Sequence, residues 1–195
     1  MARFDITYDY LCPFARIANE AVLEALDDGA PWQVTFRPFS LSQNHLEDGA
    51  VPTWERDLDD PSCRGVRALL WSLAVRDSFS EAFHLFHHAV YTAKHDTLSE
   101  IGDESVLREL AASVGLDGDA VAARVASGEP ARTLAAEHND LVASHAVFGV
   151  PTFIGNGEAV FVRLMERHNR ADIERVLDMV GWANLNEFKR TRLPM

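Results

Sequence analysis

The stretch Asp9–Asn19, DYLCPFARIAN, separates two different sequence patterns. Apolar residues alternate with polar ones over residues 3–9, and this period of two predicts a β-strand. From Pro13 onward the apolar residues recur every three or four positions, which predicts a helix as far as about Leu26. Proline suits a first helical position because the N–H that it lacks would have no partner there. Cys12, one of two cysteines in the chain, therefore lies where the strand gives way to the helix.

The position of Cys12 favours thiol chemistry. Unpaired N–H groups and the helix dipole at a helix N-terminus both favour the thiolate, which is the nucleophilic form of cysteine. A helix that follows a central strand also begins at the rim of the sheet, where ligands bind in open α/β folds. The alternative is that Cys12 is a small buried apolar residue, since free cysteine is among the most buried residue types.

The rest of the chain predicts a strand, a helical block, a hairpin and a last helix. A second strand begins at Trp32, and residues 41–58 read as a loop. Helical patterns then cover roughly 62–77, 79–93, 103–114, 117–127 and 130–146. Acidic and hydroxyl residues near positions 103 and 117 are typical of helix starts.

The segment FGVPTFIGNGEAVFVR again has a pattern that predicts β-strands. Apolar runs over 151–155 and 158–163 flank Asn156-Gly157, a pair that favours a hairpin turn because both residues accept positive φ. Pro151 opens the first run, and a proline at a strand entrance marks an edge, a bulge or a cis bond. An amphipathic helix is predicted over residues 168–182.

Composition excludes several classes of protein. The net charge of −12 disfavours binding to nucleic acid or to anionic lipid. No apolar run approaches the roughly 20 residues that span a bilayer, and the N-terminus lacks the apolar region of a signal peptide. Two cysteines far apart indicate a reducing compartment, so we expect a cytoplasmic protein. With 47% hydrophobic residues, the chain can form a genuine core.

The motifs CPFA at Cys12 and FGVPTFIGNG near the C-terminus resemble those of the DsbA family of thioredoxin-fold proteins, in the branch that carries an inserted helical domain. The resemblance implies an α/β fold with a thioredoxin-like core over 1–40 and 147–195 and an all-helical insertion over 41–146. The tail EFKRTR resembles a cytoplasmic subgroup that includes mycothiol-dependent oxidoreductases and, more distantly, 2-hydroxychromene-2-carboxylate isomerases.

The resemblance also implies roles for particular residues. Cys12 would be the nucleophile, and Pro151 would be the cis-proline beside it. The backbone of Val150 would offer strand-like hydrogen bonds to a bound thiol. The rest of the tetrapeptide and this loop would bind the thiol and the substrate. The residues are Pro13, Phe14, Ala15, Val150, Pro151 and Thr152.

The chain departs from the family pattern at Ala15, where redox members carry a second cysteine. A dithiol enzyme uses that cysteine to release its own mixed disulfide, so Cys12 would need an external thiol or Cys63 for release. We therefore expect a monothiol oxidoreductase with no tightly bound cofactor. Its co-substrate would be a low-molecular-weight thiol, mycothiol or glutathione, and its substrate a small organic molecule or a disulfide.

Other functions stay open from the sequence. A glutathione-dependent isomerase of the 2-hydroxychromene-2-carboxylate type and a non-catalytic binding module are the alternatives, and a homodimer is possible. His84 and His88 are spaced four residues apart on one helix, but a metal site needs a third ligand and the HExxH order is absent, so we expect no metal. Further candidates near Cys12 are Tyr10, Arg16, Arg37, His138 and His145. The aromatic residues of the helical block indicate a bundle core, and some could line a groove between the lobes: Trp54, Trp71, Phe79, Phe83, Phe86 and Tyr91.

Overall fold

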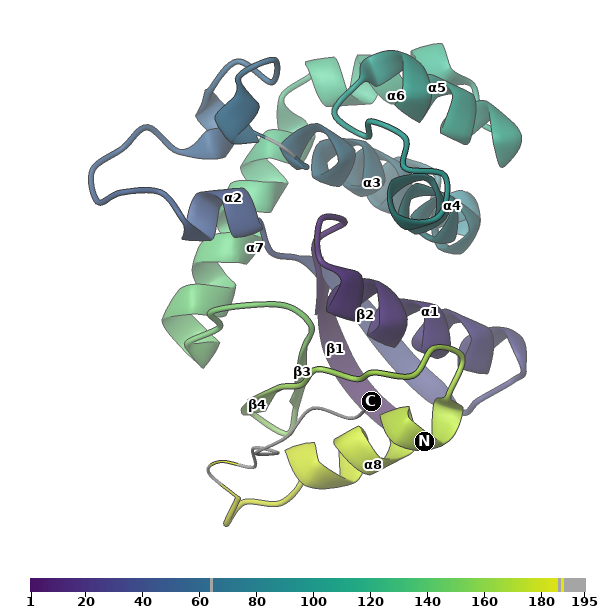
Figure 1. The fold of residues 1–195 in the computed structure, drawn as a ribbon, viewed down its shortest axis with the longest axis vertical. Helices are drawn as coiled ribbons and strands as arrows, with labels where there is room; N and C mark the ends of the chain where they lie inside the picture. Colours follow the sequence, from purple (N-terminus) through teal and green to yellow (C-terminus); the bar gives the residue numbers. More distant parts are fainter. Residues whose placement is uncertain (64, 186, 188–195) are drawn as a thin grey trace.

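A four-stranded mixed sheet forms one layer of the computed structural model, which describes residues 1–63, 65–185 and 187 (Figure 1). The strand order is β2-β1-β3-β4. The second strand in this order, β1 (Ala2–Tyr8), pairs in parallel with β2 (Trp32–Pro38) and antiparallel with β3 (Thr152–Gly155). The hairpin partner of β3 is the edge strand β4 (Glu158–Phe161).

The N-terminal unit follows from its apolar patterns. The alternation in β1 places Phe4, Ile6 and Tyr8 in the core, where each is at most 3% exposed. Helix α1 (Pro13–Asp27) buries the face predicted from its apolar spacing and returns the chain to β2. The sheet register pairs Ile6 with Phe36. This β-α-β unit therefore places the start of α1 at the same sheet edge as the end of β1.

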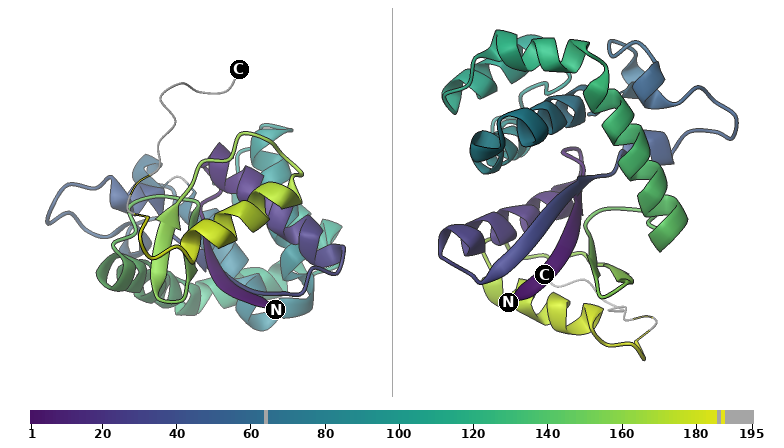
Figure 2. Two further views of the ribbon diagram at one scale, coloured as in Figure 1. Left: turned by 90° about the horizontal axis from the view of Figure 1, so that it is seen from below. Right: turned by 180° about the vertical axis from the view of Figure 1, so that it is seen from behind.

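The hairpin near the C-terminus is built by its turn residues. Asn156 and Gly157 have φ values of 55° and 84°, as the Asn-Gly pair predicts. Helix α8 (Arg170–Val180) follows the hairpin and packs against β3 and α1 (Figures 1 and 2). Its apolar face is buried through Ile173, Val176 and Val180.

Between β2 and β3 the described part of the chain is helical. Its α-helices are α2 (Leu41–Asn44), α3 (Val66–Ser78), α4 (Phe83–His95), α5 (Glu104–Ser113), α6 (Gly118–Ala126) and α7 (Glu129–His145). Short 3₁₀ turns precede or interrupt them at Thr53–Glu55, Pro61–Cys63 and Ser80–Ala82. Helices α3 to α6 lie together as a lobe, and α7 runs from this lobe back toward the hairpin (Figure 2). Two predicted caps are confirmed, because Asp103 and Asp117 accept hydrogen bonds at the starts of α5 and α6.

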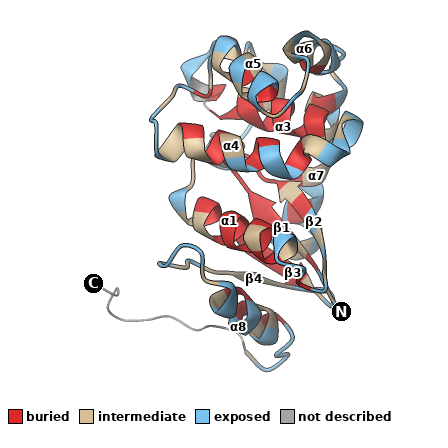
Figure 3. Cartoon of the chain, turned by 90° about the vertical axis from the view of Figure 1, so that its right-hand side faces the viewer, coloured by how far each residue is buried: buried red, intermediate tan, exposed pale blue. Residues whose placement is uncertain are grey.

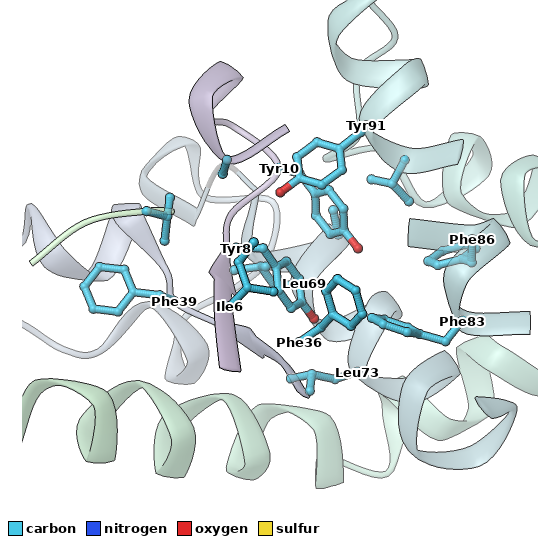
Figure 4. Packing of buried hydrophobic residues seen from close by; sticks show 14 of the residues in the cluster. Ile6, Tyr8, Tyr10, Phe36, Phe39, Leu69, Leu73, Phe83, Phe86 and Tyr91 are labelled. Atoms are coloured by element: carbon cyan, nitrogen blue, oxygen red, sulfur yellow. The ribbon is translucent and has the colours of Figure 1, made fainter. Parts of the chain in front are cut away.

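The lobe and the α/β layer share one core (Figure 3). Figure 4 shows side chains from β1, the following loop and α4 meeting there. Tyr10 lies edge-on to Tyr91, with ring centroids 4.8 Å apart. His87 stacks on Phe83 at 5.1 Å and is fully buried among these rings. The beginning of α1 is therefore packed against the helical lobe.

Several predicted boundaries were wrong by a few residues. The helices predicted to begin near 62 and 79 begin at Val66 and Phe83, because 3₁₀ turns occupy the preceding residues. The last helix ends at Val180, and β4 ends at Phe161. The tail EFKRTR lies outside the described residues except for Glu187. Within the described ranges no helix is both long and apolar enough to cross a membrane.

Candidate active site

The loop between β1 and α1 is held by a buried carboxylate. Asp9 is 1% exposed, and its two oxygens accept hydrogen bonds from the backbone N–H groups of Leu11 and Leu41, each at 2.8 Å. The N–H of Cys12 donates to the carbonyl oxygen of Asp9 at 3.2 Å. These bonds turn the chain from strand to helix and fix the position of Cys12. Asp9 was not among the site residues predicted from the sequence, where its only signal was an acidic residue directly before the turn.

The Cys12 sulfur lies between two backbone groups from distant segments. Cys12 is the N-cap of α1, and its Sγ accepts a hydrogen bond from the N–H of Ala15 at 3.4 Å. Its thiol donates to the carbonyl oxygen of Val150 at 3.4 Å. The side chain is half-buried. The structure thus brings the CPFA segment and the loop before β3 together at one sulfur atom.

The loop that carries Val150 is fixed from several sides. The peptide bond between Val150 and Pro151 is cis. Thr152 donates its N–H to Thr7 Oγ1 and its hydroxyl to the carbonyl oxygen of Gly149, both at 2.8 Å. Because β1 supplies Thr7 and also leads to Cys12, one strand positions both sides of the sulfur.

The surroundings of Cys12 favour the thiol rather than the thiolate. Burial raises the pKa of Cys12, while the N–H groups of Ala15 and Phe14 lower it. The negative charge of Asp9 raises this pKa further, and Arg163 lowers it. Burial also raises the pKa of the Asp9 carboxyl to about 6, although the hydrogen bonds from Leu11 and Leu41 lower this pKa.

The expectation that the helix N-terminus favours the thiolate is met only in part. The N–H groups are present and act in the expected direction, but partial burial and a nearby carboxylate outweigh them. The hydrogen bond from the thiol to Val150 agrees with the protonated form. These surroundings therefore keep Cys12 mainly in the thiol form at neutral pH.

Arg163, whose charge acts on Cys12, was not among the candidates predicted from the sequence, and of the aromatic rings that hold it only Phe14 was. The Arg163 guanidinium lies over the rings of Phe14 and Phe161, at 5.3 and 5.4 Å from the ring centroids. Phe148 packs on Phe161 at 5.0 Å and is 64% exposed. Phe161 and Arg163 are two residues apart in the run predicted as a strand, so period two was the signal that they share a face.

Three predicted neighbours of Cys12 have other partners. The Tyr10 hydroxyl is buried and hydrogen-bonded to His87 Nδ1 at 2.7 Å. Arg16 is 7% exposed and is held by Glu20 and Asp96. Arg37 pairs with three acidic residues on two elements, Asp5 of β1 and Glu137 and Asp140 of α7. None of these side chains is therefore left open for a bound thiol.

The predicted histidine candidates also lie elsewhere. His138 stacks on Phe39, with ring centroids 4.4 Å apart, and lies 5.3 Å from Trp54. His145 is half-buried at the end of α7. His84 is near Phe36 and Phe83. Among the residues that the structure describes, no three His, Cys, Asp or Glu side chains are arranged to hold a metal ion.

Cys63 and several aromatic residues of the helical block are buried. Cys12 and Cys63 are not joined by a disulfide, and the buried Cys63 thiol donates to the carbonyl oxygen of Thr53 at 3.4 Å. A cavity of about 630 Å³ is lined by lobe residues that include Trp54, Trp71 and Arg108. The buried aromatic residues of the block are core residues, as the favoured interpretation held: Trp71, Phe83, Phe86 and Tyr91.

Comparisons with known proteins identify the domain type. A model described as the DSBA-like thioredoxin domain matches residues 3–171. No curated protein matches the sequence significantly. Solved structures that resemble the chain include a thiol-disulfide exchange protein from Wolbachia pipientis, at 19% identity, a TM-score of 0.62, and coverage of 91% of this chain and 80% of the other.

Two further structures are similar over nearly the whole chain. A probable DsbA oxidoreductase from Streptomyces coelicolor is 17% identical, with a TM-score of 0.61, and covers 97% of this chain and 94% of its own. A 2-hydroxychromene-2-carboxylate isomerase is 16% identical, with a TM-score of 0.63, and the match covers 92% of this chain and 94% of the isomerase. At these identities the similarity establishes a shared fold.

Proposed function

The chain belongs to the family of DSBA-like thioredoxin domains, and on this basis we propose that it is a thiol-disulfide oxidoreductase that acts through Cys12 alone. The observation that carries the proposal is the position of the Cys12 sulfur, 3.4 Å from both the Ala15 N–H nitrogen and the Val150 carbonyl oxygen. This is a partly exposed thiol at a helix N-terminus, beside backbone groups that a bound thiol can pair with.

The proposed reaction has two steps. In the first, the Cys12 sulfur attacks one sulfur of a disulfide, a new S–S bond forms, and the other sulfur leaves with the electron pair of the broken bond. In the second, an external thiol attacks the mixed disulfide and restores Cys12. Ala15 cannot perform the second step, because it has no thiol. The co-substrate that completes the cycle would be a low-molecular-weight thiol such as glutathione or mycothiol.

The dependence on an external thiol suits a reducing compartment, so the proposal places the protein in the cytoplasm. A proton must also leave Cys12 in the first step. The thiol hydrogen bond to Val150 breaks when the substrate backbone or sulfur takes that place, and the N–H of Ala15 then stabilises the sulfur as it becomes negative.

The proposal is tested by incubating the protein with glutathione disulfide and measuring its intact mass. A single mixed disulfide is expected on Cys12 in the natural protein and in the Cys63→Ser variant. The Cys12→Ser variant should form none. If the natural protein forms no adduct on Cys12, or forms it only on Cys63, the proposed function is wrong.

A second candidate is glutathione-dependent isomerisation. Ala15 in place of a second cysteine favours it, together with the shared fold of the 2-hydroxychromene-2-carboxylate isomerase. An isomerase uses glutathione without oxidising it. Conversion of an isomerase substrate with no mixed disulfide on Cys12 would favour this candidate over disulfide exchange.

A further inference from the structure

Arg163 is a cation placed beside the candidate nucleophile and held by aromatic rings. Its guanidinium lies over Phe14, two residues after Cys12, and over Phe161, at 5.3 and 5.4 Å from the two ring centroids. Arg163 itself is exposed to solvent. Contacts of this kind orient the planar guanidinium while they leave its N–H donors free at the edge.

The acidic residues of the described part of the chain do not neutralise Arg163. Within that part no ion pair involves Arg163, whereas Arg16, Arg37, Arg76 and Arg167 each contact two or more acidic residues. The chain carries a net charge of −12, so a free anion meets repulsion over most of the surface. Arg163 lies near Cys12 and has no acidic partner among the described residues, so it attracts an anion to this part of the surface.

The same rings connect Arg163 to the loop that faces the sulfur. Phe161 packs against the position of Gly149, where a Cβ atom would lie 3.2 Å from the Phe161 ring. Gly149 directly precedes Val150, which accepts the Cys12 thiol hydrogen bond. The exposed Phe148 ring also packs on Phe161. A chain of contacts thus links the guanidinium, through Phe161 and Gly149, to the residue that accepts the Cys12 hydrogen bond.

We propose that Arg163 binds a carboxylate of the thiol or disulfide that reacts with Cys12, with Phe14 and Phe161 holding the guanidinium in place. Guanidinium and carboxylate groups match in geometry and form paired, charge-assisted hydrogen bonds. This inference rests on the proposed function and narrows its co-substrate. Glutathione carries carboxylates and mycothiol carries none, so Arg163 selects glutathione or another acidic thiol.

The proposed step is disulfide exchange at Cys12, and Arg163 takes no part in bond making. The carboxylate of the disulfide pairs with Arg163 while the Cys12 sulfur attacks the nearer sulfur. The S–S bond of the substrate breaks as the new one forms, and the leaving sulfur keeps the electron pair and takes up the proton that Cys12 loses. Cys12 is oxidised to the mixed disulfide, and the leaving half is reduced to a thiol.

The test compares two aromatic disulfides that differ in charge, in the Cys63→Ser background. Dithiobis(nitrobenzoate) carries a carboxylate on each ring, and dithiodipyridine carries none. Rates of Cys12 modification are measured for both, and their ratio is compared between variants. Arg163→Gln should reduce the ratio of anionic to neutral rates by about fivefold, as expected for the loss of a partly exposed ion pair. Arg163→Lys should retain most of the ratio.

A matched control removes a different exposed arginine. Arg175→Gln loses an arginine on α8 that pairs with Asp172 and should leave the ratio unchanged. Equal ratios in the natural protein and in Arg163→Gln, with Cys12 still reacting with both probes, would overturn the carboxylate site and leave the proposed function intact. If neither probe modifies Cys12 in the folded protein, the proposed function fails and the carboxylate site fails with it.

Discussion

The thiol of Cys12 donates a hydrogen bond to the carbonyl oxygen of Val150, 3.4 Å away and 138 residues later in the chain. Val150 precedes a cis-proline, and its N-terminal neighbour Gly149 accepts a bond from the Thr152 hydroxyl. The contact therefore joins the start of α1 to a loop that is fixed by its own hydrogen bonds. It places the reactive atom next to a backbone acceptor that a bound thiol can use in its place.

The first prediction concerns the pH dependence of Cys12 reactivity. Burial and the charge of Asp9 raise the pKa of Cys12, so the midpoint of its alkylation should lie above the ordinary value of about 8.5. Asp9→Asn removes the negative charge and should shift the midpoint to lower pH. The measurement is the rate of iodoacetamide modification against pH in the Cys63→Ser background.

Asp5→Asn is the control for that prediction, because it removes an acidic residue of β1 that lies further along the chain from Cys12 than Asp9 does. A midpoint well below 8.5 in the unsubstituted protein would show that the helix N-terminus dominates and that the account of Cys12 electrostatics is wrong.

The second prediction restores the missing cysteine. Ala15→Cys places a thiol one helical turn after Cys12, at the residue whose N–H already contacts the Cys12 sulfur. The variant should form an intramolecular disulfide and release a glutathione adduct without added thiol, as dithiol enzymes do. Intact mass and thiol titration follow both events. An adduct on Ala15→Cys that persists as long as in the natural protein would contradict this geometry.

The sequence predicted the β-α-β unit and the hairpin because each is determined by local patterns. The alternation in residues 3–9, Pro13 at the first helical position and Asn156-Gly157 at the turn all act over a few residues. Contacts between residues far apart in the sequence could not be predicted from such local patterns. Nothing in the spacing showed that Arg163 would lie over Phe14, since that contact depends on how the hairpin packs against α1. The same limit applies to Arg16, whose partner Asp96 comes from α4's C-cap.

The third prediction concerns the buried ion-pair network of α1. Glu20 is fully buried and contacts both Arg16 at 2.8 Å and Arg167 at 2.9 Å. Glu20→Gln leaves the buried Arg16 without one of its charged partners, so the free energy of unfolding should fall by about 3 kcal/mol. Urea denaturation measures the change.

Glu174→Gln is the matched control for this network. Glu174 pairs with Arg170 on α8, but both side chains are exposed, so its loss should change the free energy of unfolding by less than about 0.5 kcal/mol. Similar losses in the two variants would mean that the buried pair contributes no more than a surface pair.

The fourth prediction concerns acid stability. Burial lowers the pKa of His138 to about 4, so the folded protein keeps this ring neutral while the unfolded chain takes up a proton below about 6.5. Stability should therefore fall as the pH drops from about 6.5 to about 4, by up to about 3 kcal/mol from this residue. His87, whose pKa burial also lowers, acts in the same direction.

The raised pKa of Asp9 acts in the opposite direction, because its folded form takes up a proton first, near pH 6. A single variant separates the contributions. His138→Leu should show a smaller loss of stability between pH 6.5 and 4 than the natural protein in urea titrations, and His145→Leu serves as the control on the same helix. An unchanged pH dependence in His138→Leu would exclude His138 as a source of acid sensitivity.

The central claim is that Cys12 works without a second cysteine, and the fate of its mixed disulfide tests this most directly. The glutathione adduct of Cys12 is prepared, freed of excess reagent and followed by intact mass at neutral pH. The account predicts that the adduct persists by itself and disappears at a rate proportional to added glutathione. Release without added thiol, accompanied by a disulfide between Cys12 and Cys63, would contradict it.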